Sequence, residues 1–271
     1  SSMELIKKLR ETTGSGMLDC KKALAENNDD LDAAVKWLRE KGILKAQKKQ
    51  DRETNEGVIS FYNHESSLNS FSLCKIKCET DFVAKNDDYV QLAQRLSDHA
   101  LGFTNKESFL NSDFEGMKVS EKLLEQTGII GEKIEIGSFE HISASFVGSY
   151  IHAGNKIASI VGFSENFDNA SDVGKDLSMQ IAAMNPVAID ENGVSQEIIA
   201  KEIEIAKDQL RQEGKPEEML DNIAKGKLKK FFKENTLINQ QFIKDSKINI
   251  SQYIKGFSDS VEVTDFSRVG I

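Results

Sequence analysis

The sequence predicts an α+β protein with an N-terminal three-helix bundle, a duplicated α+β core and a projecting antiparallel helical hairpin. Apolar residues recur at helical spacing near both ends of the chain, and at alternate positions, as in half-buried strands, between them. With 271 residues and 39% hydrophobic content, the chain can form more than one packed unit. We expect a bundle at 3–45, a linker at 46–56, core halves at 57–126 and 127–194, the hairpin at 195–233 and a C-terminal module at 234–271.

Three short apolar stripes at helical spacing predict the N-terminal bundle. Glycines at 14 and 16 end the first helix, the polar run 27–30 ends the second, and Gly42 is expected at the C-cap of the third. The stripes consist of Leu5, Ile6 and Leu9, then Met17, Cys20, Ala23 and Leu24, then Leu31, Ala34, Val35 and Leu38. Such a unit of about 40 residues is near the minimum that folds alone.

The two core halves show the same order of elements. In the first half, strands at 58–62 and 71–78 precede a helix at 87–101, and a short helix is expected within 104–126. In the second half, residues 133–136 alternate between charged and apolar side chains, as in a strand. A hairpin at 146–163 and a helix at 169–184, ended by Asn185-Pro186, follow. This repeated order suggests an internal duplication, although the residue identities barely match.

Apolar residues at four- and three-residue spacing then predict two long helical arms joined at Gly214–Pro216. The first arm carries Ile199, Ile203, Ala206 and Leu210. Each arm spans about 25 Å at ~1.5 Å per residue, so the hairpin should project from the body. A short helix at 251–254 and an edge strand at 261–266 close the chain.

The connection at 78–86 places an aromatic residue where a turn should be polar. It joins a predicted strand to a helix whose N-cap is Asn86, and it carries Phe82 beside Asp81. An exposed aromatic on a rigid corner is typical of a binding site. Alternatively, Phe82 packs under the helix as a hydrophobic staple and Asp81 forms an Asx-type turn.

The residues Cys-Glu-Thr-Asp-Phe-Val-Ala-Lys-Asn at 78–86 resemble the signature of the bacterial elongation factor Ts family. Residues 9–24 resemble the opening of that family, whose N-terminal bundle is of the ubiquitin-associated type. The resemblance implies that Asp81 and Phe82, with Thr80 and Val83, contact elongation factor Tu, a translational GTPase. Positions on the bundle implied to meet the same GTPase are Arg10, Met17, Leu18 and Lys21. Met17 could instead complete the small core of the bundle.

Further matches lie at 127–132, 148–152 and 241–244. In these segments the resemblance implies partner contacts at Ile130, His152 and Ile243, and it implies a coiled-coil insertion at the predicted hairpin. From the residues alone, His152 is more often a satisfied strand histidine near a turn than a functional residue.

Composition excludes several classes of site. The net charge of −9 argues against a broad nucleic-acid surface, and no apolar run reaches the ~20 residues that a membrane helix needs. We therefore expect a cytoplasmic protein. No histidine lies at metal-ligand spacing to a cysteine, and no glycine-rich phosphate loop is present, so neither a metal nor a nucleotide cofactor is expected.

The resemblance implies a guanine nucleotide exchange factor that binds elongation factor Tu and promotes GDP release during translation elongation by disturbing its Mg²⁺ and phosphate site. Such a protein is not an enzyme. One alternative is an enzyme that uses Cys78, His152 and Asp81, although nothing in their spacing places them together. Another is a non-catalytic adaptor that binds ribosomal or ubiquitin-like partners.

Overall fold

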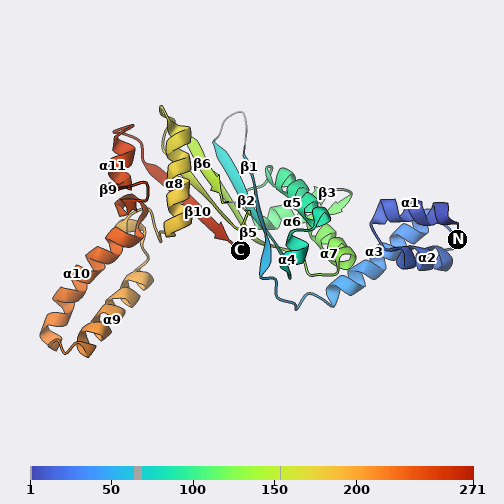
Figure 1. Ribbon diagram of the computed structural model, residues 1–271, viewed down its shortest axis with the longest axis horizontal. Coiled ribbons are helices and arrows are strands. Elements are labelled where there is room, and N and C mark those ends of the chain that lie inside the picture. The colour runs from blue at the N-terminus through green and yellow to red at the C-terminus, as the bar shows by residue number, and fades with distance from the viewer. Residues whose placement is uncertain (1, 64–68, 153) are drawn as a thin grey trace.

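The computed structural model describes residues 2–63, 69–152 and 154–271. The molecule is elongated, with the N-terminal helices at one end, the sheets in the middle and a helical hairpin at the other end (Figure 1). Helices and strands both contribute to the middle region, so the expected α+β class is confirmed. Among the described residues, no helix has both the length and the apolar character needed to cross a membrane.

Three helices form the N-terminal end: α1 (Met3–Thr13), α2 (Met17–Glu26) and α3 (Leu31–Gln47). Gly14 caps α1 in the left-handed conformation, at φ 72°, where the sequence predicts the helix to end. Buried residues from all three helices form one small core, and the loop at 27–30 joins α2 to α3. The predicted ends of the first two helices are thus confirmed.

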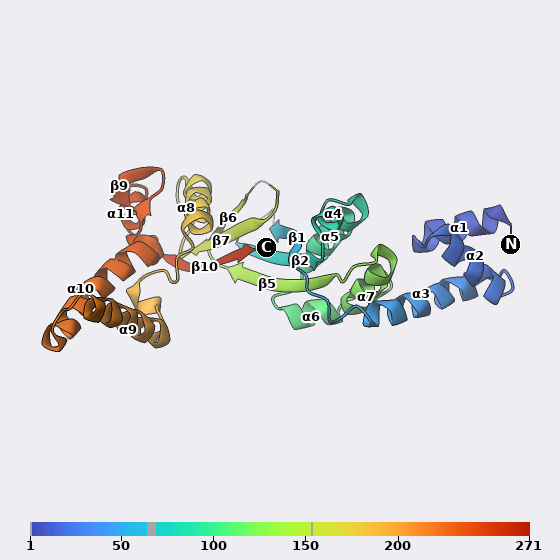
Figure 2. The ribbon, with the colours of Figure 1, turned by 60° about the horizontal axis from the view of Figure 1, so that its bottom comes forward.

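The third helix differs from the prediction, because α3 runs through Gly42 and ends only at Gln47. Gly42 lies where α3 crosses α7 (Val119–Ile130). A Cβ atom on Gly128 of α7 would come within 2.6 Å of the carbonyl oxygen of Gly42, so the helices meet backbone to backbone. Gly42 therefore serves close helix packing rather than chain termination, and α3 joins the bundle to the core as one continuous rod (Figure 2).

The first three-stranded antiparallel sheet has the order β1-β2-β5. Its strands are β1 (Glu56–Asn63), β2 (Ser70–Cys78) and β5 (Glu135–Ser143). Helices α5 (Asp87–Ala100), α6 (Lys106–Asn111) and α7, with the hairpin β3 (Asp113–Phe114) and β4 (Met117–Lys118), complete this part. The region 104–126 thus holds more than the one short helix expected.

Strand β5 lies in the range predicted for the second core half, yet it pairs with β2 of the first sheet. Local alternation identifies a strand but not its partner, so the boundary at residue 127 does not separate the two sheets.

The second three-stranded sheet has the order β10-β7-β6, and α8 covers it. Its strands are β6 (Phe146–Ile151), β7 (Ile157–Phe163) and β10 (Val263–Gly270), and α8 spans Ala170–Met184. A Cβ atom on Gly148 would come within 2.5 Å of the Cα atom of Gly174, so α8 lies directly on β6. The expected hairpin, helix and edge strand are confirmed, while Ala153 of the predicted turn lies outside the described residues.

The projecting arms are α9 (Gln196–Gln212) and α10 (Glu217–Asn235). Ion pairs connect them, between Lys207 and Asp221 at 2.8 Å and between Arg211 and Glu217 at 2.9 Å. The chain then returns to the second sheet through a small module packed beside α8. Its elements are η2 (Leu237–Asn239), β8 (Gln241–Phe242), β9 (Asp245–Asn249) and α11 (Ile250–Lys255), and the short turn η1 (Glu191–Gly193) precedes α9.

Candidate functional site

The connection between β2 and α5 is a one-turn helix, α4 (Asp81–Ala84). Thr80 caps it, because the Thr80 side chain accepts a hydrogen bond from the Val83 N–H at 3.4 Å. Asn86 caps the following helix α5 by accepting from the backbone N–H groups of its first turn. Both ends of the corner are therefore held by side-chain caps.

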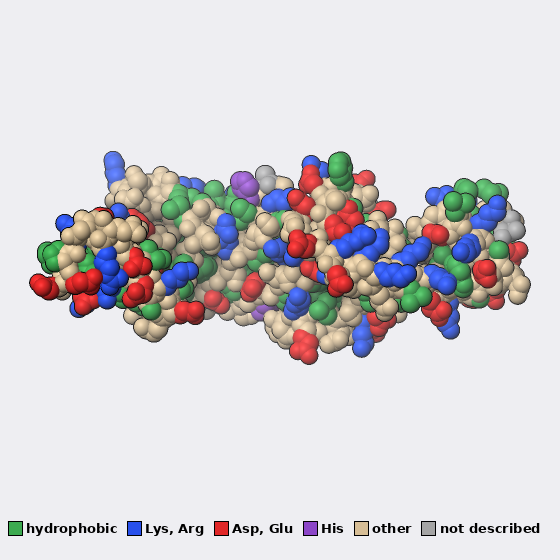
Figure 3. Space-filling view, turned by 90° about the horizontal axis from the view of Figure 1, so that it is seen from below, with side chains coloured by type: hydrophobic (Ala, Val, Ile, Leu, Met, Phe, Trp, Pro, Cys, Tyr) green, Lys and Arg blue, Asp and Glu red, His purple; other side chains and the backbone are tan. Residues whose placement is uncertain are grey.

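Phe82 points away from the protein and is 89% exposed. The next two residues turn inward, since Ala84 is buried and the half-buried Val83 packs against the core of the first half. The explanation of Phe82 as a staple under the helix is therefore wrong. Figure 3 shows hydrophobic side chains standing out along one edge of the molecule, over the N-terminal bundle and again over the middle region. An aromatic ring presented in this way exposes apolar area that a partner could bury.

Asp81 forms an ion pair with Lys85 at 2.8 Å on the outer face of the corner. The hydrogen bond from Lys85 lowers the pKa of Asp81, so this exposed carboxylate carries its negative charge at neutral pH. The alternative in which Asp81 forms an Asx-type turn does not hold, because Thr80 supplies the cap of α4. Asp81 is thus an exposed charge directly beside the exposed ring.

The candidate residues on the bundle lie at the surface of α1 and α2. Arg10 and Lys21 are exposed, Met17 is 46% exposed and Leu18 is 82% exposed. Met17 therefore does not complete the bundle core, which Cys20 and its neighbours fill. A groove beside these residues is lined partly by Met3, Ile6, Arg10 and Met17.

The remaining candidates occupy three different elements. Ile130 ends α7 and is half-buried against the core of the first half. His152 is exposed after β6, and its Nδ1 atom lies 2.8 Å from the hydroxyl of Tyr150. Ile243 follows β8 and is 44% exposed, and its backbone N–H donates to Gln180 Oε1 at 2.9 Å.

The structure brings some of these residues together and keeps others apart. The turn after His152 lies against the start of β1, where Lys156 donates to the Gly57 carbonyl at 2.8 Å. Lys156 also helps to lower the pKa of Asp81, after the larger effect of Lys85. The bundle and the C-terminal module lie at opposite ends of the molecule (Figure 1). A partner that contacts all of them must be large.

The residues of the alternative enzyme site do not form one. Cys78 is fully buried, burial raises the pKa of its thiol to about 11, and the thiol donates a hydrogen bond to the Thr80 carbonyl at 3.3 Å. A thiol with a raised pKa is a poor nucleophile. His152 contacts Tyr150 and Asp81 contacts Lys85, so the three groups have different partners.

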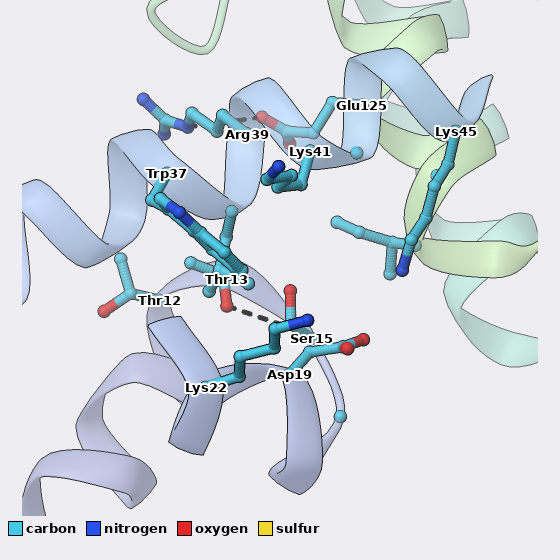
Figure 4. A pocket seen from close by; sticks show the side chains of 15 residues that line it. Thr12, Thr13, Ser15, Asp19, Lys22, Trp37, Arg39, Lys41, Lys45 and Glu125 are labelled. Atoms are coloured by element: carbon cyan, nitrogen blue, oxygen red, sulfur yellow. Dashed lines mark hydrogen bonds and ion pairs between the residues drawn. The ribbon is translucent and has the colours of Figure 1, made fainter. Parts of the chain in front are cut away.

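A pocket of about 190 Å³ lies between the α1–α2 turn, α3 and α7 (Figure 4). Arg39 and Glu125 form an ion pair at 3.4 Å on its rim, and Lys41 lies 5.5 Å from the ring centre of Trp37. Residues of the bundle and of α7 both line this pocket, and they include both positive and negative side chains. The pocket therefore lies at the junction of bundle and core. Within the described part of the chain, no group of three or more His, Cys, Asp and Glu residues is placed to hold a metal ion.

Two polar residues support the candidate contacts without being predicted to do so. Glu132 accepts hydrogen bonds from residues 79 and 80, and Gln180 donates to the Gln241 carbonyl and accepts from the Ile243 N–H on either side of Phe242. Gln180 is polar and fully buried among the apolar residues of α8, a position that sequence reasoning could have identified. Nothing local to Glu132 indicates its partners, which lie more than 50 residues away.

A family model described as Elongation factor TS matches residues 79–271. The chain belongs to the elongation factor Ts family. Elongation factor Ts of Christiangramia forsetii is 52% identical over 267 residues, covering 98% of this chain and 97% of that protein. Elongation factor Ts of Flavobacterium psychrophilum is 50% identical with the same coverage, and that of Porphyromonas gingivalis is 41% identical over 97% of this chain and 95% of its own length.

The resemblance to elongation factor Ts drawn from residues 9–24 and 78–86 is thereby confirmed. The similarity extends over the bundle, both sheets, the hairpin and the C-terminal module, because the relatives cover nearly the whole chain.

Proposed function

We propose that this member of the elongation factor Ts family, a nucleotide exchange factor for elongation factor Tu in translation elongation, uses Phe82 as a wedge. The ring enters the GTPase and shifts groups that hold Mg²⁺ and the phosphates, so that GDP leaves. The observation that carries the proposal is the exposure of Phe82, at 89%, on a corner held by caps at both ends.

Exchange needs no covalent chemistry. The factor must bind the nucleotide-free partner more tightly than the loaded one, and by linkage the nucleotide then weakens binding of the factor by the same ratio. Nucleotide can therefore later displace the factor. On this basis the chain is not an enzyme, and it requires neither a cofactor nor a metal of its own.

Burial of the Phe82 ring in the partner can supply enough free energy to change the rate of GDP release strongly. Burying an exposed phenylalanine ring contributes about 1.5–3 kcal/mol, which corresponds to roughly 10-fold to 100-fold in an equilibrium constant. Thr80, Asp81 and Val83 surround the ring and would form the rim of this contact.

The other candidates extend the interface. Arg10, Met17, Leu18 and Lys21 would meet the GTPase from the bundle. Ile130 and His152 would do so beside the corner, and Ile243 from the C-terminal module. The net charge of −9 favours a protein partner over a nucleic acid, and we place the activity in the cytoplasm, without a membrane partner.

The test is release of fluorescently labelled GDP from elongation factor Tu, followed after addition of catalytic amounts of the chain. Phe82→Ala should slow the accelerated release roughly 10-fold to 100-fold, as the loss of ring burial predicts, and leave the melting temperature unchanged. Phe257→Ala removes a ring that is 41% exposed outside the proposed contacts, and it should exchange like the original chain.

The outcomes separate the possibilities. Unchanged GDP release with Phe82→Ala would refute the wedge. Binding of the original chain without any acceleration of release would favour the adaptor function, which family membership does not favour.

A further inference from the structure

We infer that Glu132 is a positioning residue for Phe82, and that its carboxylate fixes the corner from which the ring projects. This inference rests on the proposed function and deepens it, because it names what makes the wedge rigid. Glu132 itself need not touch the partner.

Glu132 directly follows Gly131, which ends α7 in the left-handed conformation at φ 90°. Its Oε1 atom accepts hydrogen bonds from the backbone N–H of Thr80 at 2.9 Å and of Glu79 at 3.1 Å. Its Oε2 atom accepts from the Thr80 hydroxyl at 2.6 Å. One carboxylate thus binds two consecutive residues just before α4, and hydrogen bonds to a charged acceptor are stronger than neutral ones.

The contact is reciprocal. Glu79 Oε2 accepts from the backbone N–H of Lys133 at 2.8 Å, and Arg52 lies 3.5 Å from the same oxygen. Each of the two segments, 79–80 and 132–133, therefore supplies a carboxylate to the backbone of the other. We call these contacts the Glu79–Glu132 clamp. Two opposed contacts fix the position of the corner more strictly than either one alone.

The clamp acts on the ring through Thr80. The Thr80 hydroxyl donates to Glu132, and its oxygen also accepts from the Val83 N–H, which sets the first turn of α4. Phe82 is too exposed to hold itself in place by packing. Its direction depends on the backbone of α4, and an unsupported corner would have to be ordered at the moment of binding, which costs affinity.

The test compares GDP release from elongation factor Tu for four variants: Glu132→Ala, Glu132→Gln, Phe82→Ala and the double variant Glu132→Ala/Phe82→Ala. We expect Glu132→Ala to slow exchange about tenfold, because hydrogen bonds to a charged group are lost. Glu132→Gln keeps an acceptor for the two N–H groups and a donor for the Thr80 oxygen, so it should restore most of the activity. Glu121→Ala, at an exposed glutamate in the first turn of α7, is the matched control.

The double variant distinguishes positioning from general support of the fold. If Glu132 acts through Phe82, Glu132→Ala should have almost no further effect once the ring is absent. Hydrogen–deuterium exchange of the peptide 78–86 should rise in Glu132→Ala and stay unchanged in Phe82→Ala. If Glu132→Ala is unfolded at the assay temperature, Glu132→Asp, which keeps the charge but shortens the reach, takes its place with the same expectations.

The inference is overturned if Glu132→Ala exchanges like the original chain, or if it slows exchange by the same factor with and without the ring. Failure of the proposed function gives a different result, since Phe82→Ala alone would then exchange normally or the original chain would not accelerate release.

Discussion

The two halves of the core each contain a strand, a corner and a helix, and each corner carries a phenylalanine. In the first half Phe82 is 89% exposed on α4. In the second half Phe167, between β7 and α8, is half-buried and packs edge-on against Phe163 at 5.4 Å between ring centres. The same arrangement of elements thus directs one ring outward and the other inward.

The difference lies in what holds each corner. In the second half the ring itself helps to attach the corner to the core, together with hydrogen bonds between residues 164–165 and residues 258–262. In the first half the polar contacts of Thr80 and Glu132 hold it, so that Phe82 is not needed for stability. An aromatic residue at such a corner therefore does not indicate a binding site by itself. It becomes available to a partner where other groups support the corner.

The largest effect on stability should follow removal of the inward ring. Phe167→Ala should lower the free energy of unfolding by about 2 kcal/mol, below the ~3–5 kcal/mol of a fully buried phenylalanine because this ring is only half-buried. A urea titration measures the loss, and GDP release from elongation factor Tu should stay unchanged. Slower exchange by the folded variant would show that both corners serve the partner, and the contrast would fail.

A smaller effect is expected at the cap of the first corner. Thr80→Ala removes both the cap of α4 and the hydroxyl that donates to Glu132, so the free energy of unfolding should fall by about 1 kcal/mol and exchange should slow severalfold. Thermal unfolding and GDP release measure the two losses. Thr80→Ser keeps the hydroxyl, and equal defects in both variants would mean that the methyl group, not the cap, matters.

The smallest effect is expected at Lys85. Its pairing with Asp81 is exposed, so Lys85→Ala should leave thermal unfolding unchanged. The hydrogen bond from Lys85 lowers the pKa of Asp81. The small stabilisation of the fold by this pair is therefore fully present above the ordinary carboxyl pKa of about 4, and it is lost as pH falls through the lowered pKa. In the variant, carboxyl NMR should show the pKa of Asp81 raised toward its ordinary value, with exchange at pH 7 unaltered. A pKa that does not move would assign the shift to another group.

Much of the fold could be predicted from periodicity, because strongly patterned segments determine their own conformation. The helix that follows Asn86 and the two arms around Gly214 are examples. The corner itself could also be located, since the strand pattern ends before it at Cys78 and the helix cap Asn86 follows it. Which way Phe82 points could not be predicted, because the groups that support the corner are distant in sequence.

The errors have the same physical origin. Gly42 is a residue type common at helix ends, which is why it predicts a C-cap. Its role is instead set by its contact with Gly128, on a helix far away along the chain. The alternation at 133–136 indicates only the start of strand β5, and its pairing with β2 depends on the tertiary fold. Glu132 has no local pattern, because its carboxylate acts on backbone N–H groups, which every residue except proline possesses.

The rod formed by α3 has a consequence for recognition. The close contact of Gly42 with Gly128 holds α3 against α7. The distance and direction from Leu18 to Phe82 are therefore set in the free protein, before a partner binds. One residue inserted in α3 just before Gly42 would shift the bundle by ~1.5 Å along the helix and rotate it by about 100°. If Leu18 and Phe82 both contact the partner, as proposed, the two surfaces that receive them must match this spacing.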